Sequence, residues 1–155
     1  MTLHYGLTSK EQITSHARKV VSVLGGGFTA ERSLIEIAAA ETHSGTFPDS
    51  HPEKLGVGLT QFDQIGFDDV QKRTRRKDRD RVLQILGYDL GRLVLADLAY
   101  DPLLALVFTR LKYKLIPDEI PDTLEGRAKY WKKHYNTTAG KGSAEEYLER
   151  VKQYA

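Results

Sequence analysis

The chain has 155 residues, of which 40% are hydrophobic and 28% are charged, and its formal net charge is +2. This length allows one domain with a sizeable core, which we place over residues 1–155, and the composition excludes a disordered tail. The sequence contains no cysteine, which excludes disulfides and thiolate chemistry. A net charge this small does not by itself indicate a nucleic-acid partner, and no apolar run approaches the roughly 20 residues needed to span a bilayer.

The first part of the chain predicts two helices separated by three glycines. Ser9 is placed to cap the first helix, with Gln12 at the third helical position of a capping box. The glycines at 25–27 end this helix, because glycine adopts left-handed backbone angles without steric cost. Thr29 is placed to cap the second helix, which runs to about Glu41.

The end of the second predicted helix carries the residue on which the functional interpretation depends. Glu41 follows Leu34, Ile37 and Ala38 at helical spacing, so its carboxylate prolongs the stripe that should face the core. Burial disfavours the charged form of a carboxyl group and raises its pKa, as a general acid working near neutral pH requires. The alternative is a helix-end carboxylate paired with a nearby arginine or lysine. We predict that Glu41 is a general acid.

The middle of the chain predicts a loop, a compact segment and more helix. Gly45 and two prolines exclude a continuous helix through residues 42–55. Residues 56–62, GVGLTQF, predict either a small strand or a tight turn, and the helical pattern resumes at Asp63. The fold prediction is therefore mainly α, with one small β-like or irregular excursion near residues 55–62.

The last third of the chain predicts three helices. Residues 103–116 are apolar on most sides and should form the most buried helix. Thr123 and Ser143 are placed to cap the two helices that follow. Trp131 and Tyr135 lie four residues apart on one stripe of the first of these, so we expect core packing rather than stacking on a sugar ring.

Residues 41–62 carry a recognisable motif. Glu41-Thr42, a loop and then Gly-x-Gly-Leu-x-Gln-Phe at 56–62 resemble the signature of soluble lytic transglycosylases and goose-type lysozymes. The tail, from residues 110–117 to 130–137, looks like lysozyme-like proteins of phages and prophages. The resemblance implies a lysozyme-like α+β fold that cuts the β-1,4 bond between N-acetylmuramic acid and N-acetylglucosamine in peptidoglycan. It implies lytic transglycosylase or muramidase activity without a cofactor.

The resemblance also assigns roles to individual residues. Glu41 matches the catalytic acid, and Gln61 matches the glutamine that lines the sugar site. Thr42 stands where the family usually has Ser, and Thr60 where Met is common before that Gln; both are candidates for substrate binding. Tyr113 stands about where the family keeps a tyrosine on a buried helix, and is a further candidate.

A second carboxylate is the other requirement of many glycosidases. It stabilises the oxocarbenium-like transition state, and Asp49 is the nearest candidate along the sequence, followed by Asp63. Lytic transglycosylases manage with one Glu, because the C6 hydroxyl of the substrate attacks. Asp49 is therefore a candidate second catalytic residue, and the alternative is a turn residue that follows Pro48. Hydrolysis and 1,6-anhydro-forming cleavage both remain open.

Two features allow other functions. His43, Asp49 and His51 are ligand types that zinc prefers, as in a peptidase or amidase acting on the peptide stem, but their spacing matches no metalloprotease motif and we expect no metal. Residues 72–81 hold seven basic and two acidic residues, which allows a nucleic-acid-binding module. No aromatic residue lies in this run, so we expect a solvated face, or a surface that contacts anionic polymers of a cell envelope. A non-catalytic phage structural protein is a further alternative.

The N-terminal residues, MTLHYGLTSKEQ, lack the basic-then-apolar layout of a secretory signal. We therefore expect synthesis in the cytoplasm and action at the bacterial cell wall or periplasm. The expected partner is the glycan strand of peptidoglycan, without nucleic acid and without stable insertion into a membrane. A free lysis enzyme, a component of a phage virion and a toxin delivered into rival bacteria are all compatible with this expectation.

Overall fold

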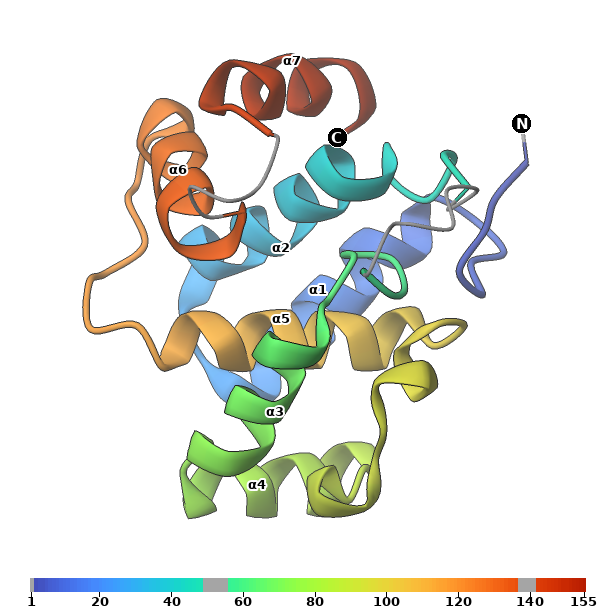
Figure 1. Cartoon of the computed structure of the whole chain (residues 1–155), viewed down its shortest axis with the longest axis vertical. Helices are drawn as coiled ribbons and strands as arrows, with labels where there is room; N and C mark the ends of the chain where they lie inside the picture. The colour runs from blue at the N-terminus through green and yellow to red at the C-terminus, as the bar shows by residue number, and fades with distance from the viewer. Residues whose placement is uncertain (1, 49–55, 137–141) are drawn as a thin grey trace.

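The structure is a computed structural model that describes residues 2–48, 56–136 and 142–155 (Figure 1). Within these ranges the chain forms a mainly helical domain without an extended strand, so the predicted fold class is confirmed. The helices are α1 (Glu11–Leu24), α2 (Gly27–Thr42), α3 (Gln64–Arg73), α4 (Arg76–Arg81), α5 (Pro102–Lys114), α6 (Leu124–Trp131) and α7 (Ala144–Tyr154). Single π-helical turns extend α4 (Val82–Leu86) and α6 (Lys132–Asn136), and two 3₁₀ turns (Leu90–Arg92 and Leu95–Leu98) lead to α5. No described helix is long and apolar enough to cross a membrane.

Helix α5 lies at the centre of the molecule. In Figure 1 it runs between α2, α6 and α7 on one side and α3 and α4 on the other. Ten of its 13 residues are buried, so the prediction that this apolar run forms the most buried helix is confirmed. It begins where the Asp101 carboxylate accepts a hydrogen bond from the Leu104 N–H, at 3.0 Å.

Two apolar cores meet at α2 and α5. The larger core lies between α1, α3 and α5, where the rings of Phe67 and Phe108 stack with centroids 4.6 Å apart. The smaller core lies between α2, α6 and α7 and contains Trp131 and Tyr147. The three alanines of α2 at positions 38–40 are all fully buried, which lets neighbouring helices approach α2 closely.

The starts of the first two helices differ from the prediction. Helix α1 follows Lys10 without a side-chain cap, and the Gln12 amide oxygen accepts the N–H of Thr8 at 2.8 Å, so the prediction that Ser9 caps this helix is wrong. Helix α2 begins at Gly27, before Thr29, because three glycines with positive φ complete the turn in fewer residues than the prediction allowed. The Thr29 hydroxyl instead lies 3.3 Å from a carboxylate oxygen of Asp122, to which it donates.

The caps of the last two helices are as predicted. The Thr123 hydroxyl accepts the N–H of Gly126 at 3.0 Å, at the start of α6. The Ser143 hydroxyl accepts the N–H of Glu146 at 3.1 Å, at the start of α7. Both hydroxyls satisfy N–H groups that have no partner inside the helix.

A buried carboxylate joins α2, α6 and α7. Glu36 in α2 is fully buried, and its two oxygens accept hydrogen bonds from Arg127 at 2.8 and 3.0 Å. The Tyr147 hydroxyl donates to the same carboxylate at 2.8 Å. Burial, together with the negative charge of Glu36, raises the pKa of Tyr147, so this phenol stays a donor. One charged cluster therefore fixes three helices.

We expect Glu36→Ala to destabilise the fold by about 3–5 kcal/mol, because it leaves the Arg127 guanidinium buried without its carboxylate. Urea denaturation of the full chain measures the loss. The matched control is Arg73→Ala, which breaks an exposed pair with Asp69 at 3.0 Å on α3 and should cost less than about 1 kcal/mol. Equal losses in the two variants would contradict a central role for the Glu36 cluster.

Candidate functional site

Glu41 lies in the last turn of α2, one residue before the helix ends at Thr42. Its side chain is half-buried, as the apolar stripe predicts. One carboxylate oxygen accepts a hydrogen bond from the indole N–H of Trp131, with 3.0 Å between Oε2 and Nε1. Trp131 is the last residue of α6 and only 1% exposed, so the orientation of this acid is set by a rigid, buried donor.

Two tyrosines line the region around Glu41. Burial raises the pKa of Tyr135, and the negative charge of Glu41 raises it further. Burial also raises the pKa of Tyr113 well above its ordinary value, with smaller contributions from Tyr135, Tyr130 and Glu41. Both phenols therefore remain neutral at physiological pH, and they form an uncharged wall within electrostatic reach of the carboxylate. Tyr113 is buried in this wall, so direct contact with a sugar is not supported by its position.

The segment that carries Gln61 is a tight turn and not a strand. A single antiparallel bridge joins Val57 and Phe62, with N–H to O distances of 2.8 and 3.0 Å. Gly58 has φ 81°, and a Cβ there would lie 2.3 Å from the carbonyl oxygen of Leu98, so only glycine fits this close approach.

This turn is tied to the residue beside Glu41. The Thr42 hydroxyl lies 2.7 Å from the carbonyl oxygen of Leu59, to which it donates, and it accepts the N–H of Gly45 at 3.1 Å. On the other side, the hydroxyls of Thr60 and Thr109 lie 2.8 Å apart. Thr42 and Thr60 are both buried, so they hold the turn in place, and we do not retain them as sugar contacts.

Gln61 occupies the last position of the turn before the bridge closes. Its backbone is left-handed, with φ 49°, and its side chain is half-buried. The amide nitrogen donates to the carbonyl of Gly58 at 3.0 Å, which fixes the side chain. Within the described part of the chain no donor reaches the amide oxygen, so this oxygen can accept a hydrogen bond from a ligand.

The second carboxylate remains a sequence prediction, because Asp49 lies outside the described residues, as does His51. Asp63, the next candidate, caps α3 by accepting the N–H of Gly66 at 2.7 Å. His43 stacks on Tyr154, with ring centroids 4.4 Å apart, and so takes part in the packing of α2 against α7. No group of three or more histidines, aspartates or glutamates that could hold a metal occurs among residues 2–48, 56–136 and 142–155.

Trp131 and Tyr135 pack in the core, as predicted, but no sequence pattern revealed their roles beside Glu41. Trp131 is the only tryptophan of the chain. A buried indole N–H requires a hydrogen-bond acceptor, and this requirement could have indicated from the sequence that Trp131 contacts a polar group. Tyr135 donates its hydroxyl to the carbonyl of Thr60 at 2.7 Å. These two residues therefore connect α6 and its π-helical turn to the acid and to the turn that carries Gln61.

A basic face lies at the end of α3 and along α4. Its exposed cations are Lys72, Arg73, Arg75, Arg76, Lys77 and Arg81. Of the two acidic residues in this run, Asp78 is buried and paired with Lys114 at 2.9 Å, whereas Asp80 is exposed. The prediction of a solvated face agrees with these exposures, and the face is strongly positive because its exposed cations outnumber its one exposed carboxylate.

Comparison of the chain with models of protein families, with curated proteins and with solved structures finds no match in any of the three. The functional proposal therefore depends on the motif at residues 41–62 and on the geometry around Glu41.

We expect Thr42→Val to loosen the turn, because it removes the hydroxyl that binds Leu59 and Gly45 and leaves both backbone groups unpaired, at a cost of about 1–3 kcal/mol. Amide hydrogen exchange at Val57 and Phe62 should accelerate at least about tenfold, the factor that corresponds to ~1.4 kcal/mol. Thr42→Ser keeps the hydroxyl and should leave exchange there nearly unchanged. Acceleration in Thr42→Ser but not in Thr42→Val, which keeps the methyl group, would show that packing of the methyl group, and not the hydrogen bond, holds the turn.

Proposed function

We propose that the protein is a peptidoglycan-cleaving glycosidase of the lytic transglycosylase or muramidase type, with Glu41 as the general acid. The observation that carries the proposal is the setting of Glu41: a half-buried carboxyl at the end of α2, oriented by the indole of Trp131 and flanked by neutral tyrosines. The Gln61 turn is fastened to the adjacent Thr42, so acid and amide are held in a fixed relation.

The proposed chemistry is cleavage of the β-1,4 bond. Glu41 transfers its proton to the bridging oxygen as the bond to C1 of the N-acetylmuramic acid residue breaks, and positive charge develops at C1 and the ring oxygen. Reaction at C1 by the C6 hydroxyl of the same sugar gives a 1,6-anhydro ring, and reaction by water gives a reducing end; in either case the proton of the attacking O–H group passes to the Glu41 carboxylate and restores the acid. The Trp131 hydrogen bond keeps the acid in one orientation, which general acid catalysis requires.

Of the residues around Glu41, one contacts the substrate in this proposal and the others hold the site in shape. The amide oxygen of Gln61 accepts a hydrogen bond from the glycan strand. Thr42 and Thr60 hold the turn, and Tyr113 forms part of the wall around Glu41. Asp49 remains a candidate for stabilising the positive charge at C1.

We expect Glu41→Gln to lower the rate of turbidity loss of a peptidoglycan suspension by about 10²–10⁴-fold, because the substitution keeps the shape and removes the transferable proton. Glu149→Gln, on the exposed face of α7, makes the same chemical change away from the site and should leave the rate unchanged. Mass spectrometry of the digest identifies 1,6-anhydro ends or reducing ends.

Lysis at equal rates by wild type and the Glu41 variant would exclude this mechanism. Absence of lysis by either protein, together with binding to intact peptidoglycan, would favour a non-catalytic structural protein.

The basic face supports a second element of the proposal, attraction to the anionic polymers of the cell wall. Raising salt from 0.1 to 1 M shortens the Debye length from about 10 to about 3 Å, so binding to isolated cell walls should weaken steeply. Simultaneous replacement of Arg75, Arg76 and Lys77 by Gln should reduce binding at low salt and flatten the salt dependence. A cosedimentation assay measures both effects.

The control for net charge is the simultaneous replacement of Lys10, Lys129 and Lys152 by Gln, because these exposed lysines lie outside the basic face. If both triple variants lose binding equally, total charge and not the basic face attracts the wall. Tighter binding to double-stranded DNA than to cell walls would instead favour the nucleic-acid-binding alternative.

A further inference from the structure

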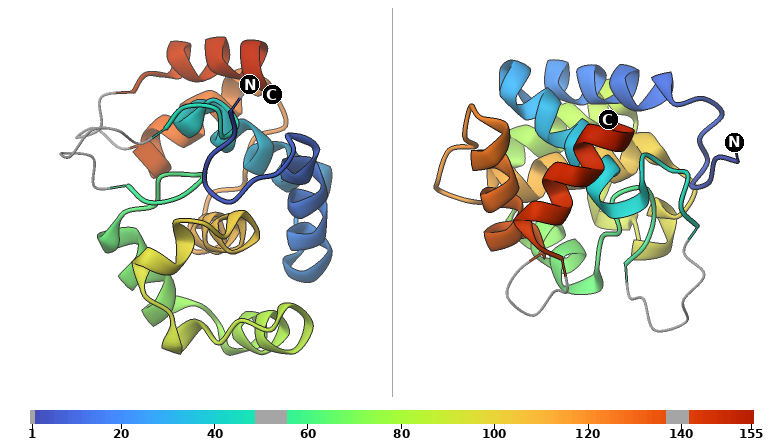
Figure 2. Two further views of the ribbon diagram at one scale, coloured as in Figure 1. Left: turned by 90° about the vertical axis from the view of Figure 1, so that its right-hand side faces the viewer. Right: turned by 90° about the horizontal axis from the view of Figure 1, so that it is seen from above.

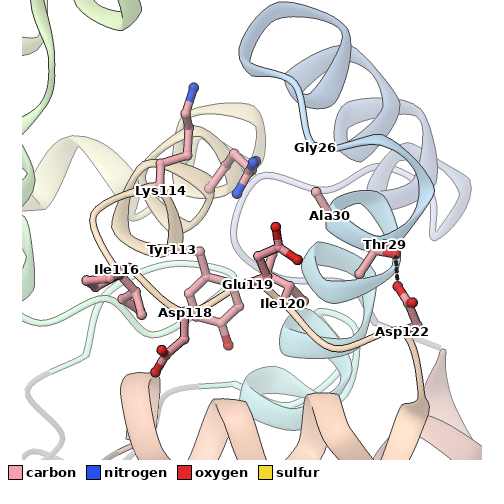
Figure 3. Close-up of a pocket in the computed structure, with 12 residues that line it drawn as sticks. Gly26, Thr29, Ala30, Tyr113, Lys114, Ile116, Asp118, Glu119, Ile120 and Asp122 are labelled. Carbon is pink, nitrogen blue, oxygen red and sulfur yellow. Dashed lines mark hydrogen bonds between the residues drawn. The ribbon is translucent and has the colours of Figure 1, made fainter.

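A cavity of about 460 Å³ lies beside the first turn of α2, at the opposite end of this helix from Glu41 (Figure 3). At 1.5 Å per residue, Gly27 and Glu41 are about 21 Å apart along the axis, so the cavity and the proposed catalytic site lie at opposite ends of α2. Tyr113, part of the wall around Glu41, also lines the cavity. Residues of α2, of the end of α5 and of the linker between α5 and α6 line it. Its volume is within the range of small-molecule sites, roughly 300–1,000 Å³.

Arg110 of α5 brings a buried positive charge to this cavity. The residue is only 8% exposed and lines the cavity, and its Nε donates to the carbonyl of Gly25 at 3.0 Å. Among the described residues no carboxylate comes within 4.0 Å of its guanidinium, and neither terminal nitrogen has a hydrogen-bond acceptor. Burial lowers the pKa of Arg110, and the negative charge of Asp78 offsets this effect only in part.

The guanidinium lies directly against the start of α2. A Cβ on Gly26 would meet the Nη2 atom of Arg110 at 2.6 Å and its Cζ at 3.0 Å. Helix α2 has no side-chain cap, and the described residues provide no acceptor for the N–H groups of Gly27, Phe28 and Thr29. A cation at a helix N-terminus is electrostatically unfavourable, and a bound anion would relieve this conflict while satisfying both groups of donors.

The rest of the lining restricts the kind of anion. Glu119 reaches from the linker into the ring of lining residues, while Asp118 points away from it (Figure 3). Asp122, which accepts from the Thr29 hydroxyl at 3.3 Å, and Lys114, which pairs with Asp78, also line the cavity. A nearby carboxylate repels a dianion such as phosphate more strongly than it repels a single carboxylate. Ile116, Pro117 and Ile120 add apolar surface next to the charged groups.

We infer that this cavity binds the carboxylate of a small organic acid with an apolar body. Its carboxylate oxygens accept from the guanidinium of Arg110 and from the first-turn N–H groups of α2, and its apolar part packs on Ile116 and Ile120. Glu119 weakens binding by repulsion. The inference uses none of the residues assigned to the glycosidase and does not depend on that function.

Titration of the ¹⁵N-labelled full chain at constant ionic strength tests this site, with acetate, butyrate and phosphate as the probes. Acetate should shift the amide signals of residues 26–29 in a saturable manner, butyrate should bind several-fold more tightly than acetate, and phosphate should bind more weakly. Arg110→Gln should weaken butyrate binding at least tenfold, and Arg92→Gln, which alters an exposed arginine of a 3₁₀ turn, should not change it.

Glu119→Gln changes an exposed residue that should not affect folding, and it should strengthen butyrate binding several-fold even if the Arg110 variant fails to fold. Non-saturable shifts that follow total salt, or unchanged binding in Arg110→Gln, would overturn the site. Phosphate binding tighter than butyrate binding would overturn the assignment to organic acids.

Discussion

The carboxylate of Glu36, shared between Arg127 and Tyr147, fixes the geometry of the upper half of the molecule, because α2, α6 and α7 all contribute to it. Along α6, Trp131 lies four residues after Arg127, an advance of about 6 Å; along α2, Glu41 lies five residues after Glu36, an advance of about 7.5 Å. The two advances are similar, and the indole of Trp131 reaches the Glu41 carboxylate one turn beyond the first pair. Helices α2, α6 and α7 lie together in the ribbon views (Figure 2). A structural ion pair thus positions the proposed catalytic group.

In the part of the chain that the structure describes, buried carboxylates form ion pairs, and one buried arginine does not. Glu36 has Arg127, and Asp78 has Lys114 at 2.9 Å, so each carboxylate recovers part of the cost of leaving water from a partner distant in sequence. Arg110 is the exception among the described residues, since it is buried against backbone atoms and a cavity without a carboxylate at ion-pair distance. A buried charge without an ion-pair partner is a candidate for binding a ligand of opposite charge.

Local patterns predicted the parts of the fold that depend on neighbours in sequence. The apolar run of α5 and the cap by Thr123 were correct, because helix periodicity and capping involve residues at most four positions apart. The partners of Glu36 lie 91 and 111 residues away, so a single glutamate within an apolar helix gave no sign of its burial. Glu41 could be proposed as the acid from its place on the apolar face of α2 and from the motif at residues 41–62. Its contact with Trp131 depends on how α6 packs against α2, which no local pattern predicts.

The two ends of α2 carry charges of the sign that a helix disfavours. The positive N-terminal end faces the guanidinium of Arg110 as well as the Asp122 carboxylate bonded to Thr29, and the negative C-terminal end carries the carboxylate of Glu41. Each arrangement costs roughly 0.3–1 kcal/mol compared with the opposite sign, so stability alone would favour exchanging them. Natural sequences break such local rules chiefly at functional sites, where the unfavourable charge is compensated by a ligand or by a change of protonation. The electrostatics of one helix therefore support both proposals: an anion bound at its start and a proton held at its end.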